Sequence, residues 1–364
     1  MPDTFFCADA SKCVQEDIIG TGSNYQTYVL IECCLPWESE AFNSKQVSQN
    51  LRDLVEEVEH SKQKIRFLLI NSDKTKCADK RKVLIYDNKS QELFGGYKKY
   101  EFNANNIEQV AGIVKSYLAG EVPDCEVDNN SSRDILVCTH GSHDRCCARY
   151  GNPFYAQATA LISELELSDV RVWKSSHFGG HRMAPTAIDL RDGRYYGNLD
   201  RTSFKSILTR TGDIECLNKV YRGWGILPNQ IQVLEREFII RYGWDWFNYK
   251  VAGRILEKYP ENDCFVAELT FEKVDGTYTY RADLVKDETK TVRLKGSCGA
   301  KQESEFVKYL VKDSYFYSKK DESKFVIYPF LDFRRDKTAV ETASTQTNTA
   351  VETASTQTMS ASAD

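Results

Sequence analysis

The sequence predicts an α/β protein that consists of two tandem thioredoxin-like units, a C-terminal α+β region and a disordered tail. The tandem units are predicted because a strand, a helix, a strand, a hairpin and a closing helix follow one another over 27–118 and again over 134–210. Strand–helix–strand order indicates helices packed against a sheet. The tail is predicted because the ten residues 338–347 recur at 349–358.

The first unit is expected over residues 1–123. Its first strand is a continuous apolar run, as in a buried strand, and its first helix has apolar residues at helical spacing. Gly120 and Pro123 end the last helix, as a C-terminal glycine and a following proline often do. The expected elements are a strand at 27–34, a helix at 44–62, a strand at 65–70, a hairpin of 83–86 with 92–94, and a helix at 107–118.

The second unit is expected over residues 131–211, after a polar linker at 124–133. Its order of elements repeats that of the first unit, although the two share no detectable sequence identity. The expected elements are a strand at 134–137, a helix at 153–167, a strand at 170–173, a hairpin of 186–190 with 195–199, and a helix at 203–210.

The remaining chain divides into a folded region at 212–336 and a tail at 337–364. Residues 230–256 are expected to be helical with an interruption at 243–246, and strands are expected at 264–273, 278–285 and 291–294. Turn residues at 274–277 predict a hairpin there. The tail is rich in Thr, Ser and Ala, so it cannot bury enough apolar surface to offset the entropy of ordering.

Composition excludes several classes of protein. The 364 residues carry a net charge of −5, which argues against a broad nucleic-acid surface. No apolar run reaches the roughly 20 residues of a membrane span, and the N-terminus lacks a secretory signal. We therefore expect a cytoplasmic protein. The 12 cysteines are then not expected to form a disulfide framework, and no CxxC pair indicates a thiol–disulfide oxidoreductase.

Four of the five histidines lie between residues 138 and 181, beside three cysteines. Cys138 follows one predicted strand and His177 follows the next, and the carboxyl ends of neighbouring parallel strands meet at one edge of a sheet. Cys147 and His181 are close to these two in sequence. Two thiolates and two imidazoles suit either Zn²⁺ or an iron–sulfur cluster of the Rieske type, in which histidines replace two cysteines.

The passages CTHGSHDRCCARYGNPFY and VWKSSHFGGHRMAPTAIDLRDGRYYGNLD resemble the sucrase/ferredoxin-like family. The opening FFCADASKCVQEDIIGTGSNYQTYVLIECCLPWESEAF is also similar to that family, so the resemblance covers roughly residues 5–205 and extends more loosely through 221–246. It implies a thioredoxin-like ferredoxin whose 2Fe–2S cluster is bound through a CX8C and an HX3H pair. These pairs are Cys138 with Cys147 and His177 with His181.

The resemblance implies a one-electron carrier rather than a stand-alone enzyme. Neutral histidine ligands raise the reduction potential above that of a four-cysteine cluster, and the imidazoles can couple reduction to proton uptake. The chain departs from the family at His143, where arginine is usual, so His143 is a bystander, a neighbour of the cluster or an alternative ligand. The residues expected around the ligands are His140, His143, Arg145, Cys146 and Arg182.

Simpler interpretations of the same residues remain open. Cys146 is expected to be a small buried apolar residue, and His140 to be a loop residue that forms hydrogen bonds. A zinc-binding structural module would be colourless with stoichiometric zinc, and a metal-free enzyme would keep its activity after chelation. A sucrose-type glycoside hydrolase needs two placed carboxylates, which no motif singles out.

No dinucleotide-binding GxGxxG follows a predicted strand. We therefore expect electrons to come from a separate reductase. The acceptor and the oligomeric state stay open.

Overall fold

The computed structural model describes residues 4–73, 75, 80–88, 92–121, 123, 125–127, 131–320 and 325–326. The predicted tail at 337–364 lies outside these residues. Within the described part, no helix combines the length and apolar character needed to cross a membrane.

The α/β class is confirmed, and the two units have the same topology. In the first, β1 is parallel to β2 and antiparallel to β3, which pairs with β4; in the second, β6 has the same relations to β7, β8 and β9. The first unit contains β1 (Thr27–Glu32), α2 (Gln49–His60), β2 (Ile65–Asn71), β3 (Arg81–Asp87), β4 (Lys98–Ala104) and α3 (Ile107–Leu118). The second contains β6 (Arg133–Cys138), α4 (Arg145–Glu164), β7 (Val170–Ser175), β8 (Ala187–Asp189), β9 (Arg194–Tyr196) and α5 (Arg201–Thr209).

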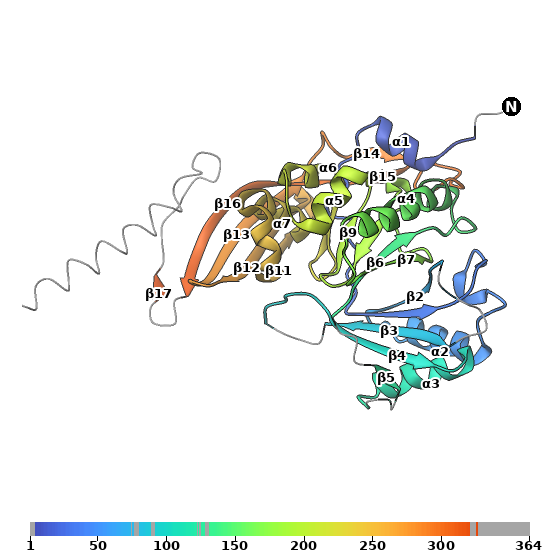
Figure 1. Cartoon of the computed structure of the whole chain (residues 1–364). Coiled ribbons are helices and arrows are strands. Elements are labelled where there is room, and N and C mark those ends of the chain that lie inside the picture. The colour runs from blue at the N-terminus through green and yellow to red at the C-terminus, as the bar shows by residue number, and fades with distance from the viewer. Residues whose placement is uncertain are drawn as a thin grey trace, which may run out of the picture.

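The two units share one sheet of ten strands, in the order β10-β9-β8-β6-β7-β2-β1-β3-β4-β5. The units join where β2 pairs antiparallel with β7, through Ile70 opposite Ser175 and Asn71 opposite Lys174. The sheet bends there, so its two halves face each other, with α2 and α3 outside one half and α4 and α5 outside the other (Figure 1). The edge strands are β5 (Glu126–Val127) and β10 (Tyr221–Trp224).

Apolar and charged side chains fill the space between the two half-sheets. The hydroxyls of Tyr28 and Tyr195, one from each half, lie 2.6 Å apart. Arg171 bridges Glu101 at 2.9 Å and Asp134 at 2.6 Å, and thereby ties β4 of the first unit to β6 of the second. Cys138 belongs to this shared core, which places the end of β6 at the boundary between the units.

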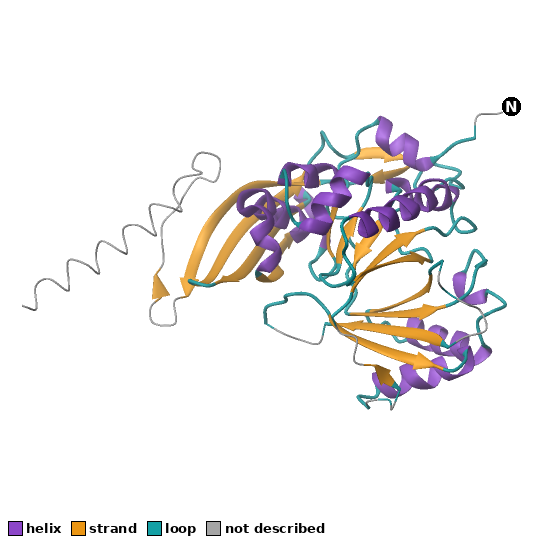
Figure 2. Cartoon of the chain, in the orientation of Figure 1, coloured by secondary structure: helices purple, strands orange, loops and turns teal. Residues whose placement is uncertain are grey.

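The C-terminal region forms a five-stranded antiparallel sheet, in the order β11-β12-β13-β16-β17, that packs on α7 (Figure 2). Phe238 of α7 contacts Phe271 and Tyr280 of the sheet, with ring centroids 5.6 and 4.9 Å apart. Strands β14 and β15 pair with each other in a separate two-stranded sheet, and β14 contacts α1 (Cys7–Cys13). The elements are α6 (Leu217–Val220), α7 (Asn229–Tyr242), β11 (Lys250–Tyr259), β12 (Cys264–Lys273), β13 (Gly276–Lys286), β14 (Val292–Leu294), β15 (Ser304–Phe306), β16 (Tyr309–Lys320) and β17 (Phe325–Val326).

Three local predictions were wrong. The hairpin expected between 83–86 and 92–94 is replaced by pairing of β3 with β4, and Phe94 instead forms an isolated bridge with Val251. The α-helix expected through 256 ends at Tyr242, a 3-10 helix occupies Gly243–Asn248, where the interruption was expected, and the residues from Lys250 form β11, which pairs with β12. The helix expected from Pro153 begins at Arg145, where the side chain of Asp144 caps it by accepting from the N–H of Cys146. Pro153 lies inside the helix, although an interior proline removes a hydrogen bond and crowds the preceding turn.

The other local predictions in the C-terminal region agree with the structure at the level of whole elements. Strands occur at both sides of the turn at 274–277, and a strand occurs at Val292–Leu294. The boundary expected at 211 leaves β10 in the C-terminal region, although β10 pairs with β9 and thereby completes the ten-stranded sheet of the two units.

Candidate metal centre

Cys138 and Cys147 are brought together by the close packing of α4 on the end of β6. Cys138 is the last residue of β6, and Cys147 lies in the first turn of α4. Gly151 allows this approach, because a Cβ atom at that position would lie 1.9 Å from the carbonyl oxygen of Cys138. Both cysteines are buried, with exposures of 2% and 1%.

His177 follows β7 and points its ring at the two sulfur atoms. Its Nδ1 lies 3.7 Å from Sγ of Cys138 and 3.5 Å from Sγ of Cys147. The backbone of His177 is held from two sides: its N–H donates to Nδ1 of His140 at 3.2 Å, and its carbonyl oxygen accepts from Arg66 of β2 at 2.8 Å. The first unit therefore helps to position a candidate ligand of the second.

His181 follows His177 by four residues, after two glycines with positive φ, and begins a short 3-10 helix at His181–Met183. Gly179 and Gly180 have φ values of 96° and 85°, a conformation that favours glycine. Nε2 of His181 lies 2.6 Å from the carbonyl oxygen of Gly296, which can only accept, so Nε2 carries the proton. Nδ1 of His181 is buried and has no hydrogen-bond partner among the described residues. This nitrogen has a free lone pair, as a metal ligand requires.

The donor atoms form two overlapping groups, each with its atoms within 4.8 Å of one another. One contains Cys138, Cys147 and His177, and the other contains His143, His177 and His181. Within the described part of the chain, His177 is the member common to both. The structure thus places all four predicted ligands in one continuous patch, and their assignment as ligands stays a prediction.

Burial and neighbouring charges set the protonation of this patch. Burial lowers the pKa of His177 to about 2, with a further contribution from the neighbouring His143, so the ring is neutral. Burial opposes ionisation of Cys138, yet hydrogen bonds from Cys147 and from backbone N–H groups lower its pKa overall. The hydrogen bond to Cys138 and burial raise the pKa of Cys147. The first proton of the cysteine pair is therefore lost from Cys138 more easily than the second is lost from Cys147, and a bound cation would favour loss of both.

Arg222 of β10 is a functional candidate that the sequence analysis missed. Its guanidinium is buried and bonds the carbonyl oxygens of Gly179 at 3.1 Å and Thr21 at 2.8 Å, and no carboxylate of the described residues pairs with it. Burial lowers the pKa of Arg222 to about 10, which leaves it charged near pH 7, and its charge acts on Cys138. No motif marks this residue in the sequence, because it follows His181 by a long segment.

His140 and His143 have different environments. His140 is buried, and its Nε2 donates to the carbonyl oxygen of Glu38 at 2.7 Å while its Nδ1 accepts from His177, so both ring nitrogens are used. Burial lowers the pKa of His140. His143 is exposed and stacks on the ring of His177, with centroids 4.1 Å apart and planes inclined by 18°.

The other residues expected around the ligands have partners elsewhere. Arg182 bonds Glu16 at 2.9 Å and covers the ring of Phe306. Arg145 is exposed and donates to the carbonyl oxygens of Phe5 and Cys298. Cys146 is fully buried, as expected of a small apolar residue, but its sulfur faces two other cysteines, Cys7 and Cys298. Ten described cysteines are free thiols, whereas Cys34 is disulfide-bonded.

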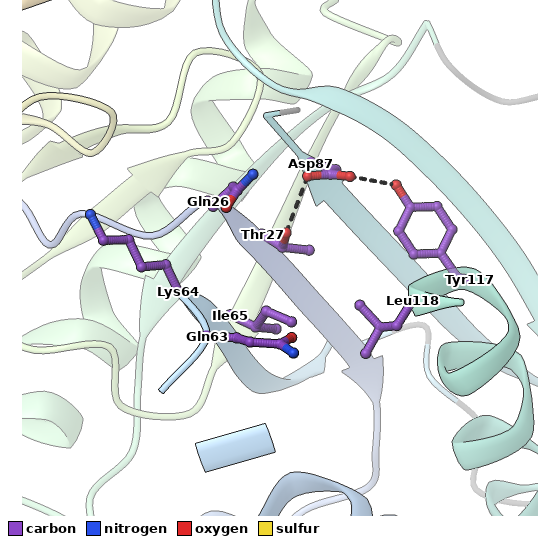
Figure 3. A pocket seen from close by; sticks show the side chains of 8 residues that line it. All are labelled: Gln26, Thr27, Gln63, Lys64, Ile65, Asp87, Tyr117 and Leu118. Carbon is purple, nitrogen blue, oxygen red and sulfur yellow. Dashed lines mark hydrogen bonds between the residues drawn. The ribbon is translucent and has the colours of Figure 1, made fainter. Parts of the chain in front are cut away.

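A cavity of about 220 Å³ lies in the first unit, away from this patch (Figure 3). Its one carboxylate, Asp87, accepts hydrogen bonds from Thr27 at 3.1 Å and Tyr117 at 3.0 Å. None of the predicted site residues lines it. The lining residues are Gln26, Thr27, Gln63, Lys64, Ile65, Asp87, Tyr117 and Leu118.

Comparison with known proteins identifies the family. The family model described as sucrase/ferredoxin-like matches residues 18–223, which is more than half of the 364 residues and includes both strand ends that carry the Cys/His patch. Searches among curated proteins and among solved structures gave no match. The extent of the family match shows that the chain belongs to the sucrase/ferredoxin-like family.

Proposed function

We propose that this protein is a one-electron carrier that holds a 2Fe–2S cluster through Cys138, Cys147, His177 and His181. Such a cluster accepts and donates single electrons at a potential that its ligands tune. The observation that carries the proposal is the buried Nδ1 of His181, which lacks a partner among the described residues and lies in one patch with His177. A buried polar atom without a partner costs free energy, so its presence favours a ligand there.

The grouping of the donors favours a binuclear centre over a single zinc ion. Zinc bonds of about 2.0–2.3 Å in a tetrahedron keep all four donors within roughly 4 Å of one another. Here the two sulfurs group with His177, while His181 groups with His177 and His143. The four donors thus do not surround one point in the tetrahedral manner of zinc. A cluster in which the two cysteines bind one iron and the two histidines bind the other requires His177 to move away from the sulfurs, because its Nδ1 lies 3.7 and 3.5 Å from them.

The chain's own residues orient the ligands. His140 and Arg66 fix the backbone of His177, and the Gly296 carbonyl holds the proton of His181 on Nε2, away from the metal-facing nitrogen. The exposed ring of His143 covers His177. We propose that a separate reductase and an acceptor approach over His143, because this is where the buried patch comes nearest to solvent.

The test is the iron and sulfide content of anaerobically purified full-length protein, with EPR spectra after reduction. We expect two iron and two sulfide ions per chain. His177→Cys and His181→Cys should each retain a cluster whose potential is lower, because a thiolate adds negative charge. His60→Cys is the matched control, since His60 is exposed at the end of α2, and its spectrum should equal that of the unaltered protein. Absence of iron and sulfide, or zinc bound by these four residues, would contradict the proposal.

A further inference from the structure

A second group of metal-binding side chains lies beside the Cys138–His181 patch and uses none of its four residues. It consists of Cys7, Asp144, Cys146 and Cys298, whose donor atoms all lie within 4.8 Å of one another. Cys7 begins α1, Asp144 precedes α4, Cys146 lies in the first turn of α4, and Cys298 lies in the loop between β14 and β15. Three segments far apart in the sequence therefore converge on one point.

The three sulfur atoms form a nearly equilateral triangle. Sγ of Cys146 lies 3.6 Å from Sγ of Cys7 and 3.3 Å from Sγ of Cys298. The Sγ atoms of Cys7 and Cys298 are 3.7 Å apart. A tetrahedral ion with metal–sulfur bonds of about 2.3 Å places its sulfurs roughly 3.8 Å apart. A disulfide would need about 2.0 Å. Thiolates bound to different irons of a cluster lie much farther apart, so the triangle fits a single ion.

Asp144 supplies a fourth donor in a fixed orientation. Its Oδ1 accepts from the N–H of Cys146 at 2.8 Å, and its Oδ2 accepts from the N–H of Cys298 at 2.9 Å. A carboxylate can accept about four hydrogen bonds, so lone pairs remain for a cation. Oδ1 lies 3.9 Å from Sγ of Cys7 and so closes the fourth side of the group.

The surroundings favour a thiolate at Cys146. Cys7 and Cys146 are buried, and the N–H of Ala8 points at Sγ of Cys146 from 3.4 Å. Cys146 sits at the N-terminal end of the 20-residue helix α4, where the helix dipole stabilises negative charge. The guanidinium of Arg145 bonds the carbonyl oxygens of Phe5 and Cys298 and brings positive charge to the rim of the group.

We propose that Cys7, Cys146, Cys298 and Asp144 bind one Zn²⁺ ion in a closed tetrahedral site. Thiolate-rich four-coordinate sites of this kind suit zinc, and a closed site has a structural role. The ion joins α1 and the β14–β15 loop to the start of α4. This proposal is independent of the proposed electron-transfer function, because the two sites share no ligand.

The experiment measures zinc and cobalt binding by the full chain in a Cys138→Ser, Cys147→Ser background, which removes two ligands of the other centre. One Zn²⁺ per chain is expected, and Co²⁺ in its place should give the intense absorption of tetrahedral cobalt–thiolate sites. Adding Cys7→Ser or Cys298→Ser should weaken metal binding at least about tenfold. Cys13→Ser is the matched control, because Cys13 is exposed at the other end of α1, and it should bind metal as before.

Zinc K-edge absorption spectra of the unaltered protein supply a second measurement that needs no variant to fold. Three sulfurs at about 2.3 Å and one lighter atom are expected in the zinc shell. A shell without sulfur, no bound zinc or cobalt, equal loss of metal in Cys13→Ser, or a disulfide among Cys7, Cys146 and Cys298 found by mass spectrometry would overturn the proposal.

Discussion

Cys146 and Cys147 are neighbours in the first turn of α4, yet their sulfur atoms belong to two different groups of candidate ligands. Sγ of Cys147 lies 3.5 Å from Nδ1 of His177, whereas Sγ of Cys146 lies 3.3 Å from Sγ of Cys298. Consecutive helical residues point about 100° apart, so one turn can serve two sites on different sides of the helix. The position of α4 relative to β6 therefore affects both groups.

Gly151→Ala should disturb this position. The new Cβ would meet the carbonyl oxygen of Cys138 at 1.9 Å, which forces α4 away from β6. We expect a loss of about 1–3 kcal/mol in the free energy of unfolding, measured by urea denaturation, together with a loss of bound iron. Gly112→Ala in α3 is the control, since nothing lies within 4 Å of its Cβ and alanine favours a helix by about 1 kcal/mol. Equal stability of the two variants would show that α4 tolerates the shift.

Removing the charge of Arg222 should lower the reduction potential of the proposed cluster. The buried guanidinium cation stabilises the electron that the cluster gains. One such charge contributes about 1 kcal/mol to this stabilisation, which corresponds to a change of roughly 40 mV in the one-electron reduction potential. We expect Arg222→Gln to show this decrease in a redox titration followed by absorbance. Arg222→Lys keeps the positive charge but not the several hydrogen bonds of the guanidinium group. The reduction potential of this variant should stay nearer to that of the unaltered protein. Equal shifts in both variants would assign the effect to packing.

His140→Ala should weaken the site without removing a ligand. It leaves the buried N–H of His177 and the carbonyl oxygen of Glu38 without their partner, which costs about 1–3 kcal/mol. His143→Ala removes an exposed ring and should change the free energy of unfolding by less than about 0.5 kcal/mol. Both are measured by urea denaturation with iron analysis. Full iron content in His143→Ala would exclude His143 as a ligand, and loss of iron would show that His143 is needed to hold it.

Glu16 should make the fold sensitive to acid. Burial opposes its ionisation, but hydrogen bonds and charges from Arg182 at 2.9 Å and Lys308 at 2.8 Å lower its pKa to about 2. The pKa of Glu16 in the folded protein therefore lies below the usual glutamate value of about 4.3. The ionised carboxylate contributes its full stabilisation of the fold above about pH 4.3, and this stabilisation is lost as the pH falls through about 2. Glu16→Gln should lower the free energy of unfolding by about 3 kcal/mol at pH 7. The difference in free energy of unfolding between the variant and the unaltered protein should become smaller as the pH is lowered. A difference that stays constant down to pH 2 would contradict this assignment.

The sequence predicted the order of elements well and the contacts between distant segments poorly. Cys138 and His177 could be placed together because both follow strands, and parallel strand ends meet. Residues 250–256 were predicted to be helical as the end of one long stretch at 230–256, whereas pairing with β12, a contact between separate segments, makes them a strand. Cys7 and Cys298 could not be linked to Cys146, because no local pattern connects segments that meet only after three parts of the chain have packed.

The β14–β15 loop has a practical consequence for the choice of truncation boundaries when the protein is expressed. The family match ends at residue 223, but the carbonyl oxygen that holds His181 belongs to Gly296, and Lys308, which pairs with Glu16, follows soon after. A chain truncated at 223 keeps all four proposed cluster ligands and loses the contacts that seal one side of them. Exposure of that side to oxygen and solvent would then shorten the lifetime of the centre, so the longer chain is the unit to express.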